Sequence, residues 1–133
     1  MGFSDAVRTC LGKYATFSGR ASRSEYWWFY LFTFLVFFAL TILDMVAFGY
    51  NPEDPTSYPK LVLIGLVAIF LPMLSAAIRR LHDTDRSGWW YLIGLVPIVG
   101  GIVLLIFLIL KGTEGANRFG PDPLGSDAHG IFD

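Results

Sequence analysis

The chain has 133 residues, of which 54% are hydrophobic and only 16% are charged. Soluble domains carry roughly 25% charged residues, so this composition indicates a single domain that is solvated largely by lipid. The formal net charge of -1 excludes a strongly basic protein that binds nucleic acid. Cys10, the one cysteine, can form neither an internal disulfide nor a metal site by itself.

The N-terminal residues predict a short amphipathic helix over about residues 3–16 rather than a cleaved signal peptide, which would need an apolar core and a small-residue cleavage site. One face of this helix carries its apolar side chains at helical spacing: Phe3, Val7, Cys10, Leu11 and Tyr14. Such a helix lies in the plane of a membrane surface with its basic side near lipid phosphates. The alternative is an amphipathic helix that packs on protein.

The first predicted membrane span covers about residues 26–48. Ser22 and Glu25 have the spacing of a capping box, which marks a helix start. Trp27 and Trp28 lie among the aromatic residues of the first turns, as in the aromatic belt at a membrane surface. At 1.5 Å per residue, about 22 apolar residues extend roughly 30 Å, which is enough to cross the hydrocarbon.

The second predicted span covers about residues 61–78 and follows a proline-rich acidic loop at 51–59. Pro72 lies inside this span, so we expect a kink there. Small residues at Gly65 and at 75–77 would allow another helix to approach closely.

The third apolar run, residues 89–110, contains Pro97, Gly100 and Gly101 and permits two arrangements. It can cross the membrane as a kinked helix, or it can fold back as a re-entrant turn. A re-entrant turn leaves backbone polar groups that must be buried in protein, and two spans offer little cover. We therefore favour the kinked crossing. The polar tail, residues 111–133, is expected to be a loop with disordered last residues.

Basic residues predict the orientation. Seven of the ten lysines and arginines precede the first span or lie between the second and third apolar runs. The positive-inside rule places these segments in the cytoplasm, so we expect a multi-pass protein with a cytoplasmic N-terminus.

The segment from 78 to 90 is the densest charge cluster of the chain, and it shares a pattern with the start of the first span. An arginine and a serine precede paired tryptophans twice, in Arg23 with Trp27 and Trp28, and in Arg86 with Trp89 and Trp90. Plain interfacial anchoring explains both. The sharper hypothesis adds Arg20, Arg79 and Arg80 and predicts a cytoplasmic site for anionic phospholipid headgroups or a partner protein.

Three further ionisable side chains, His82, Asp83 and Asp44, are candidates for metal binding, catalysis or transport. His82 and Asp83 adjoin each other without distant ligands, so we expect no metal, no cofactor and no catalytic role. Arginine–carboxylate pairs that rigidify the loop explain them more simply. Asp44 is ionisable inside a span and is therefore a functional candidate. It lies about one turn from the outer end, where it could reach water or pair with Lys60.

Three segments, residues 19–27, 79–90 and 112–123, resemble in order the signatures of the YhaH-like family of bacterial inner-membrane proteins, a family with a domain of unknown function (805). The resemblance covers nearly the whole chain. It implies a small polytopic protein without an established activity and supplies no catalytic residue. It also singles out the arginines, His82, Asp83 and the tail motif as distinctive positions, which favours a lipid- or partner-binding site at the cytoplasmic face that includes His82 and Asp83. If the tail belongs with them, the third run must fold back.

We therefore expect an all-α integral membrane protein with an interfacial helix and three hydrophobic segments. The favoured role is a non-enzymatic accessory subunit that docks on anionic lipids, on a larger membrane complex, or on both. The alternative is a component of a homo-oligomeric small-solute or ion transporter. It would need polar residues that face a shared interior, and only Asp44 and Ser75 qualify. An enzyme using His82 and Asp83 ranks last.

Overall fold

The computed structural model describes residues 1–124, and every element in that range is helical. The elements are α1 (Phe3–Gly12), α2 (Arg23–Ala47), α3 (Lys60–Asp83), a 3-10 helix η1 (Gly88–Leu95) and α4 (Val99–Ile109). Helices α2 and α3 are long and apolar enough to cross a membrane, and α4 is a shorter apolar helix. The predicted all-α class with apolar helices is confirmed, whereas the expected disorder of the last residues lies outside the described range.

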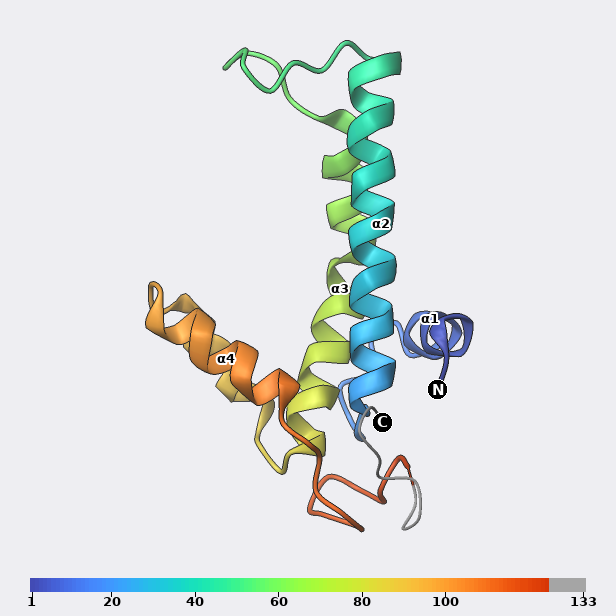
Figure 1. Cartoon of the computed structure of the whole chain (residues 1–133), viewed down its shortest axis with the longest axis vertical. Helices are drawn as coiled ribbons and strands as arrows, with labels where there is room; N and C mark the ends of the chain where they lie inside the picture. The colour runs from blue at the N-terminus through green and yellow to red at the C-terminus, as the bar shows by residue number, and fades with distance from the viewer. Residues whose placement is uncertain (125–133) are drawn as a thin grey trace.

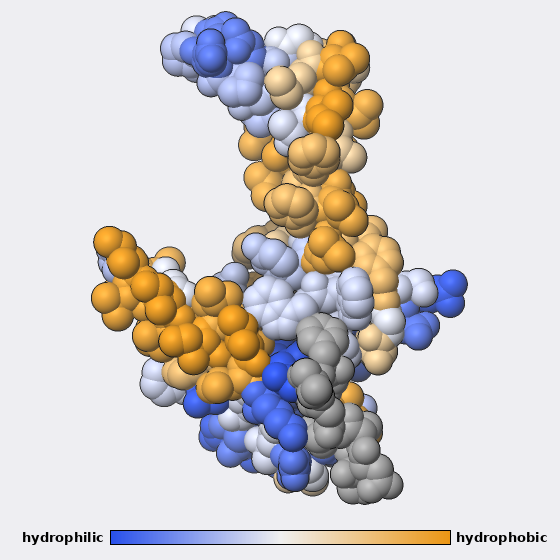
Figure 2. Space-filling view, viewed as in Figure 1, coloured by the Kyte–Doolittle hydropathy of each residue, from blue (hydrophilic) through white to orange (hydrophobic). Residues whose placement is uncertain are grey.

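Helices α2 and α3 run antiparallel and form a stem, and two arms leave the same end of it (Figure 1). One arm is α1, which lies across the stem. The other is the hairpin of η1 and α4, on the opposite side. The loop 48–59 closes the far end of the stem. Apolar surface covers the upper stem and the hairpin, while polar residues gather at the two ends (Figure 2).

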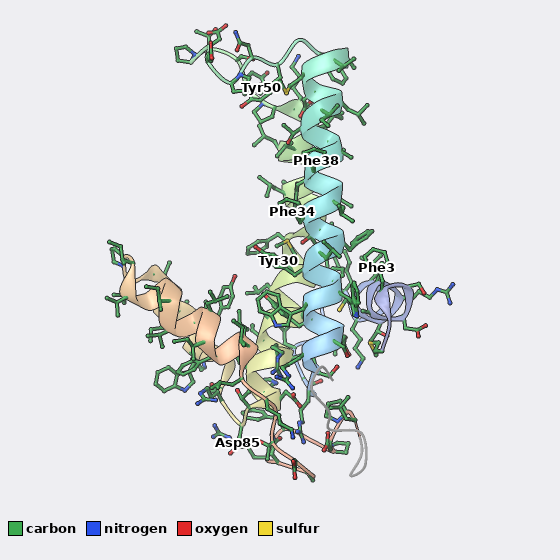
Figure 3. The ribbon with its side chains drawn as sticks, in the orientation of Figure 1. Phe3, Tyr30, Phe34, Phe38, Tyr50 and Asp85 are labelled. Atoms are coloured by element: carbon green, nitrogen blue, oxygen red, sulfur yellow. The ribbon has the colours of Figure 1, made fainter. Side chains whose placement is uncertain are left out.

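Helix α2 begins where the capping box predicts. Ser22 has an extended backbone, and its hydroxyl accepts the Glu25 N–H at 3.2 Å. This satisfies one of the free amides of the first turn and starts the helix three residues before the apolar run. Tyr30, Phe34 and Phe38 then follow one another along one exposed face of α2 (Figure 3).

Helix α3 extends beyond the predicted span, through Asp83. Residues 79–83, which we expected to be loop, are its last turns. Arginine, leucine and histidine do not break helices, and the helix ends only where Asp85 adopts a positive φ of 59°. The Arg86 N–H then returns to the Leu81 carbonyl at 3.0 Å. The charged residues are therefore held on a rigid helix.

The third apolar run folds back, so the favoured kinked crossing is wrong in this structure. Pro97 ends the first arm, and Ile98 turns the chain with a φ of 66°. A Cβ added at Gly100 would lie 1.8 Å from the Ile93 carbonyl oxygen, so only glycine lets the two arms meet there. Local bonds such as Gly100 N–H to Val96 O at 3.1 Å satisfy the tip. The tip residues 94–99 are themselves exposed, so local hydrogen bonds rather than burial in protein pair the backbone groups of the turn.

The stem depends on the small residues that the sequence indicated. A Cβ at Gly65 would lie 2.8 Å from Leu40 Cδ1 and 3.3 Å from Phe37 Cε1, so α2 and α3 approach closely there. Ala76 joins Cys10 and Phe29 in the buried core between the stem and α1.

Gly65→Leu is expected to lower the free energy of unfolding by about 1–3 kcal/mol, because the added side chain overpacks the α2–α3 contact. Unfolding by SDS in mixed micelles measures this change. Ala39→Leu, at an exposed position of α2, is the matched control and should cost little. Equal effects of the two substitutions would contradict a close approach at Gly65.

Candidate functional site: a buried ionic cluster

Five charged side chains from distant segments meet at the end of the stem where the two arms leave. We call Arg20, Glu25, Arg79, Arg80 and Asp83 the ionic cluster. Each of these residues is at most 5% exposed. Arginines outnumber carboxylates by three to two, so backbone carbonyls must satisfy the remaining guanidinium donors.

Asp83 is the shared carboxylate of the cluster. Its Oδ1 accepts from Arg20 Nε at 3.0 Å, and its Oδ2 accepts from Arg80 Nη1 at 2.6 Å. The tail passes directly over this carboxylate, since a Cβ at Gly112 would lie 2.0 Å from Asp83 Oδ2. The Thr113 N–H donates to the Asp83 carbonyl at 2.7 Å. Asp83 therefore joins α3 to both the 13–22 connection and the tail.

Arg79 links the three helices of the stem junction. Its Nη1 pairs with the Glu25 carboxylate of α2, and its Nη2 lies 3.9 Å from Cys10 Sγ of α1. The Arg79 carbonyl accepts the Ala21 N–H at 2.9 Å. Within residues 1–124 its Nε has no hydrogen-bond partner. A fully buried arginine in this setting depends on Glu25 for charge compensation.

Arg80 caps the C-terminus of α4. It donates from Nε to the Leu108 carbonyl at 3.0 Å and from Nη2 to the Leu110 carbonyl. The Trp27 indole N–H donates to the same Leu108 oxygen at 3.2 Å. The last carbonyls of a helix lack intrahelical partners and carry its negative dipole end, so a cation stabilises them. Arg80 thus fastens the hairpin to the stem.

Arg20 holds the tail in the same way. It donates to the Gly115 carbonyl at 2.6 Å, to the Gly120 carbonyl at 3.3 Å, and to the Thr113 carbonyl. His82 completes the contact, because its ring stacks on Phe119 with centroids 4.0 Å apart.

The neighbourhood of His82 is also occupied from within the chain. Its Nδ1 lies 2.9 Å from the Gly19 carbonyl. Asn117 donates to the His82 carbonyl at 2.9 Å. His82 is thereby bonded to the 13–22 connection on one side and to the tail on the other.

The remaining predicted site residues lie outside the cluster. Arg23 is half-buried and makes interactions of its own. Trp28 packs its ring edge-on with Phe3 of α1. The Arg86 guanidinium lies 4.2 Å from the Phe107 ring centroid inside the hairpin. The structure therefore separates these side chains from the five that it brings together.

The paired tryptophans of the hairpin differ from one another. Trp90 packs edge-on against Phe107 with centroids 5.7 Å apart, whereas Trp89 is 79% exposed. The structure thus assigns Trp90 to the packing of the hairpin and leaves Trp89 on its surface.

Asp44 caps a helix instead of pairing with Lys60. It is fully buried, and its carboxylate accepts the Leu61 N–H at 2.8 Å and the Val62 N–H at 3.0 Å. It thereby satisfies the start of α3 from across the stem. Ser75 donates to the Lys13 and Tyr14 carbonyls. Asp44 and Ser75 are therefore both bonded within the chain.

Sequence reasoning missed Glu25, Cys10 and the tail carbonyls as members of this site. The sequence predicts Glu25 only as part of a capping box, although an acidic residue close to Arg20 and Arg23 is a usable signal. No sequence pattern identifies backbone carbonyls as arginine partners. Among the described residues, no three His, Cys, Asp or Glu side chains converge on a common metal position.

An open apolar groove lies between α3 and η1. It consists of two hollows of about 450 and 430 Å³ that share Leu74 and Tyr91. Leu66, Val67 and Phe70 line the first, towards the middle of the stem. His82 and Ser87 lie at the second, near the ionic cluster. The groove is thus apolar along its length with polar groups at one end.

The fold and the cluster define a small helical membrane protein whose charged side chains fasten its own segments together. Residues 14–121 match the family model described as "Protein of unknown function (DUF805)". The chain belongs to this family, which confirms the resemblance drawn from the three motifs. The matched residues include all five members of the ionic cluster and the tail carbonyls that Arg20 contacts. Cys10, which lies beside the cluster, precedes the match.

Two relatives from Escherichia coli K12 cover most of the chain. The inner membrane protein YhaI is 45% identical over 113 residues, or 85% of this chain and 90% of its own length. The inner membrane protein YhaH is 42% identical over 113 residues, with 85% and 91% coverage. A more distant relative from the same organism, the uncharacterized protein YiiR, is 26% identical over 132 residues, with 80% of this chain and 85% of its own length covered. No solved structure matches the chain.

The Cys10 thiol is expected to resist alkylation. Burial, reinforced by the Glu25 carboxylate, raises its pKa from 9.0 to about 12. Only the thiolate reacts, so at pH 7 the thiolate fraction falls on the order of a thousandfold. Maleimide labelling of the native protein should be slow and should become fast in SDS. The control is Ser4→Cys in a Cys10→Ala background, an exposed thiol on the same helix; similar native labelling rates would contradict the buried thiol.

Asp83→Ala is expected to destabilise the protein by about 3–5 kcal/mol, because it leaves two buried guanidinium groups without their carboxylate. Asp85→Asn is the matched control, because asparagine removes the charge and tolerates the positive φ of 59° at this residue. Its ion pair with Arg118 at 3.3 Å is exposed and should contribute at most about 1 kcal/mol. SDS unfolding of both variants measures the difference. A loss at Asp83 no larger than at Asp85 would show that the cluster does not support the fold.

Proposed function

We propose that this chain is a non-enzymatic accessory protein of the bacterial inner membrane that docks on another membrane protein through its apolar groove. In this proposal α2 and α3 both cross the bilayer with the N-terminus in the cytoplasm. The relatives named as inner membrane proteins support the location. The seven basic residues at one end of the stem support the orientation.

The position of α1 supports an interfacial role for this helix. Its buried residues, Ala6 and Cys10, face the stem, whereas Arg8 and Lys13 are exposed. With α1 at the level of the lipid headgroups, the hydrocarbon core of the membrane surrounds the part of the stem between α1 and the loop 48–59. The ionic cluster then extends from the level of α1 away from the hydrocarbon core. Arg8 and Lys13, rather than the buried arginines, are then the cations available to anionic phospholipids.

The observation that carries the docking proposal is that Arg80 and Trp27 fasten the end of the hairpin to the stem. Both walls of the groove, α3 and η1, are thereby fixed relative to each other. A fixed apolar groove at the level of the inner leaflet suits a partner's transmembrane helix, which associates by shape and close packing. The arginines themselves are satisfied by carboxylates and carbonyls within the chain, so docking falls to the apolar surface.

Val67→Trp is expected to abolish co-purification of a membrane partner, because the indole would fill the groove. Val67 is 82% exposed and lines the first hollow. Val46→Trp, at an 80% exposed position near the far end of α2, is the matched control and should retain the partner. Mild-detergent purification followed by quantitative mass spectrometry measures partner and bound lipid together.

Each outcome of this experiment is informative. A stoichiometric partner that Val67→Trp loses and Val46→Trp keeps supports the proposal. A partner that both variants keep places docking elsewhere, and a homo-oligomer without a partner supports the transporter alternative. In the same samples, Arg8→Gln with Lys13→Gln should deplete anionic phospholipid; unchanged lipid would contradict the role of α1.

A further inference from the structure

The third apolar run is long enough to cross a membrane, yet it folds back. Residues 89–110 comprise about 22 apolar residues, which as a helix would reach roughly 33 Å. From Lys111 onwards the tail carries only two basic residues, Lys111 and Arg118. The positive-inside rule, which counts basic residues, therefore holds the tail on the side of the N-terminus only weakly.

Contacts within the chain hold the tail on the side of the N-terminus instead. Arg80 donates to two carbonyls at the C-terminus of α4, and Arg20 donates to three carbonyls of the tail. A crossing helix would carry all five acceptors to the other side of the membrane. Arg20 would then lose its three tail carbonyls and keep the Asp83 carboxylate, whereas Arg80 would lose both α4 carbonyls and keep Asp83 and the Ala21 carbonyl at 3.2 Å. Hydrogen bonds to charged donors are among the strongest in proteins, so these contacts favour the folded-back state.

The hairpin itself contains one feature that favours this state and one that opposes it. Gly100 allows the arms to meet, since a Cβ there would lie 1.8 Å from the Ile93 carbonyl oxygen. Ile98 opposes it, because a β-branched residue with a φ of 66° is strained. A strained turn persists only when surrounding contacts hold it.

We propose that Arg80 is the topological determinant of the third segment: its cap on α4 keeps the hairpin folded back and the tail on the side of the N-terminus. Without this cap the run can cross, and the tail emerges on the opposite side. The proposal concerns the relative sides of the two termini and so does not depend on the orientation proposed above.

The test places an epitope tag at each end of the full chain and measures protease protection after insertion into inverted inner-membrane vesicles. Both tags of the native sequence should be on one side. Arg80→Gln should raise the fraction with tags on opposite sides by about tenfold, as expected for the loss of charged hydrogen bonds. Reading topology at insertion makes the result independent of whether the variant later accumulates in cells.

Two further variants sharpen the test. Gly100→Ala should act like Arg80→Gln, whereas Gly101→Ala, where an added Cβ meets nothing within 4 Å, should behave like the native sequence. Ile98→Gly relieves the strained turn and should partly restore same-side tags to Arg80→Gln. The proposal is overturned if Arg80→Gln alone keeps both tags on one side as often as the native sequence does, or if Gly101→Ala changes sides as often as Gly100→Ala. The N-terminal tag alone reports the side on which the N-terminus lies. An error in the proposed orientation is therefore seen separately from an error in the role of Arg80.

Discussion

The structure depends on one carboxylate that two arginines share. Asp83 lies at the last turn of α3 and accepts from Arg20 on one side and Arg80 on the other. Through Arg80 it supports the end of α4, and through Arg20 it supports the tail. A buried carboxylate between two guanidinium groups is stable only when further donors and acceptors are satisfied, and here backbone carbonyls take that role. The charged residues therefore act as fasteners within the molecule.

Much of the fold was predictable because it follows from local chemistry. Ser22 and Glu25 start α2, the apolar length of α2 and α3 identifies them as membrane-length helices, and Gly65 marks their close approach. These features depend on side chains within a few turns of one another. The three motifs also identified the family, and the motif in the tail indicated that the third run could fold back.

The candidate site was predictable in its residues but not in its accessibility. The sequence singles out Arg20, Arg79, Arg80 and Asp83, and the structure brings all four together. It does not reveal that they are buried, because Arg20 and Arg80 donate to backbone carbonyls of residues 108–120, which any sequence could supply. The prediction that the third run crosses the membrane was wrong for a similar reason, because the cap on α4 comes from Arg80, a residue on another helix.

Arg20 and Arg80 lie far in the sequence from the carbonyls of residues 108–120 that they contact, so these contacts form late in the synthesis of the chain. The carbonyl partners of Arg20 lie 93 to 100 residues further on, so they leave the ribosome only when almost the whole chain has been made. During that interval α2 and α3 can already pair and Asp83 can reach both arginines, while their remaining N–H donors must be solvated by water or by lipid phosphates. The last segment to be synthesised thus displaces this solvent and closes the molecule, and a chain truncated before residue 108 would leave two cations uncovered.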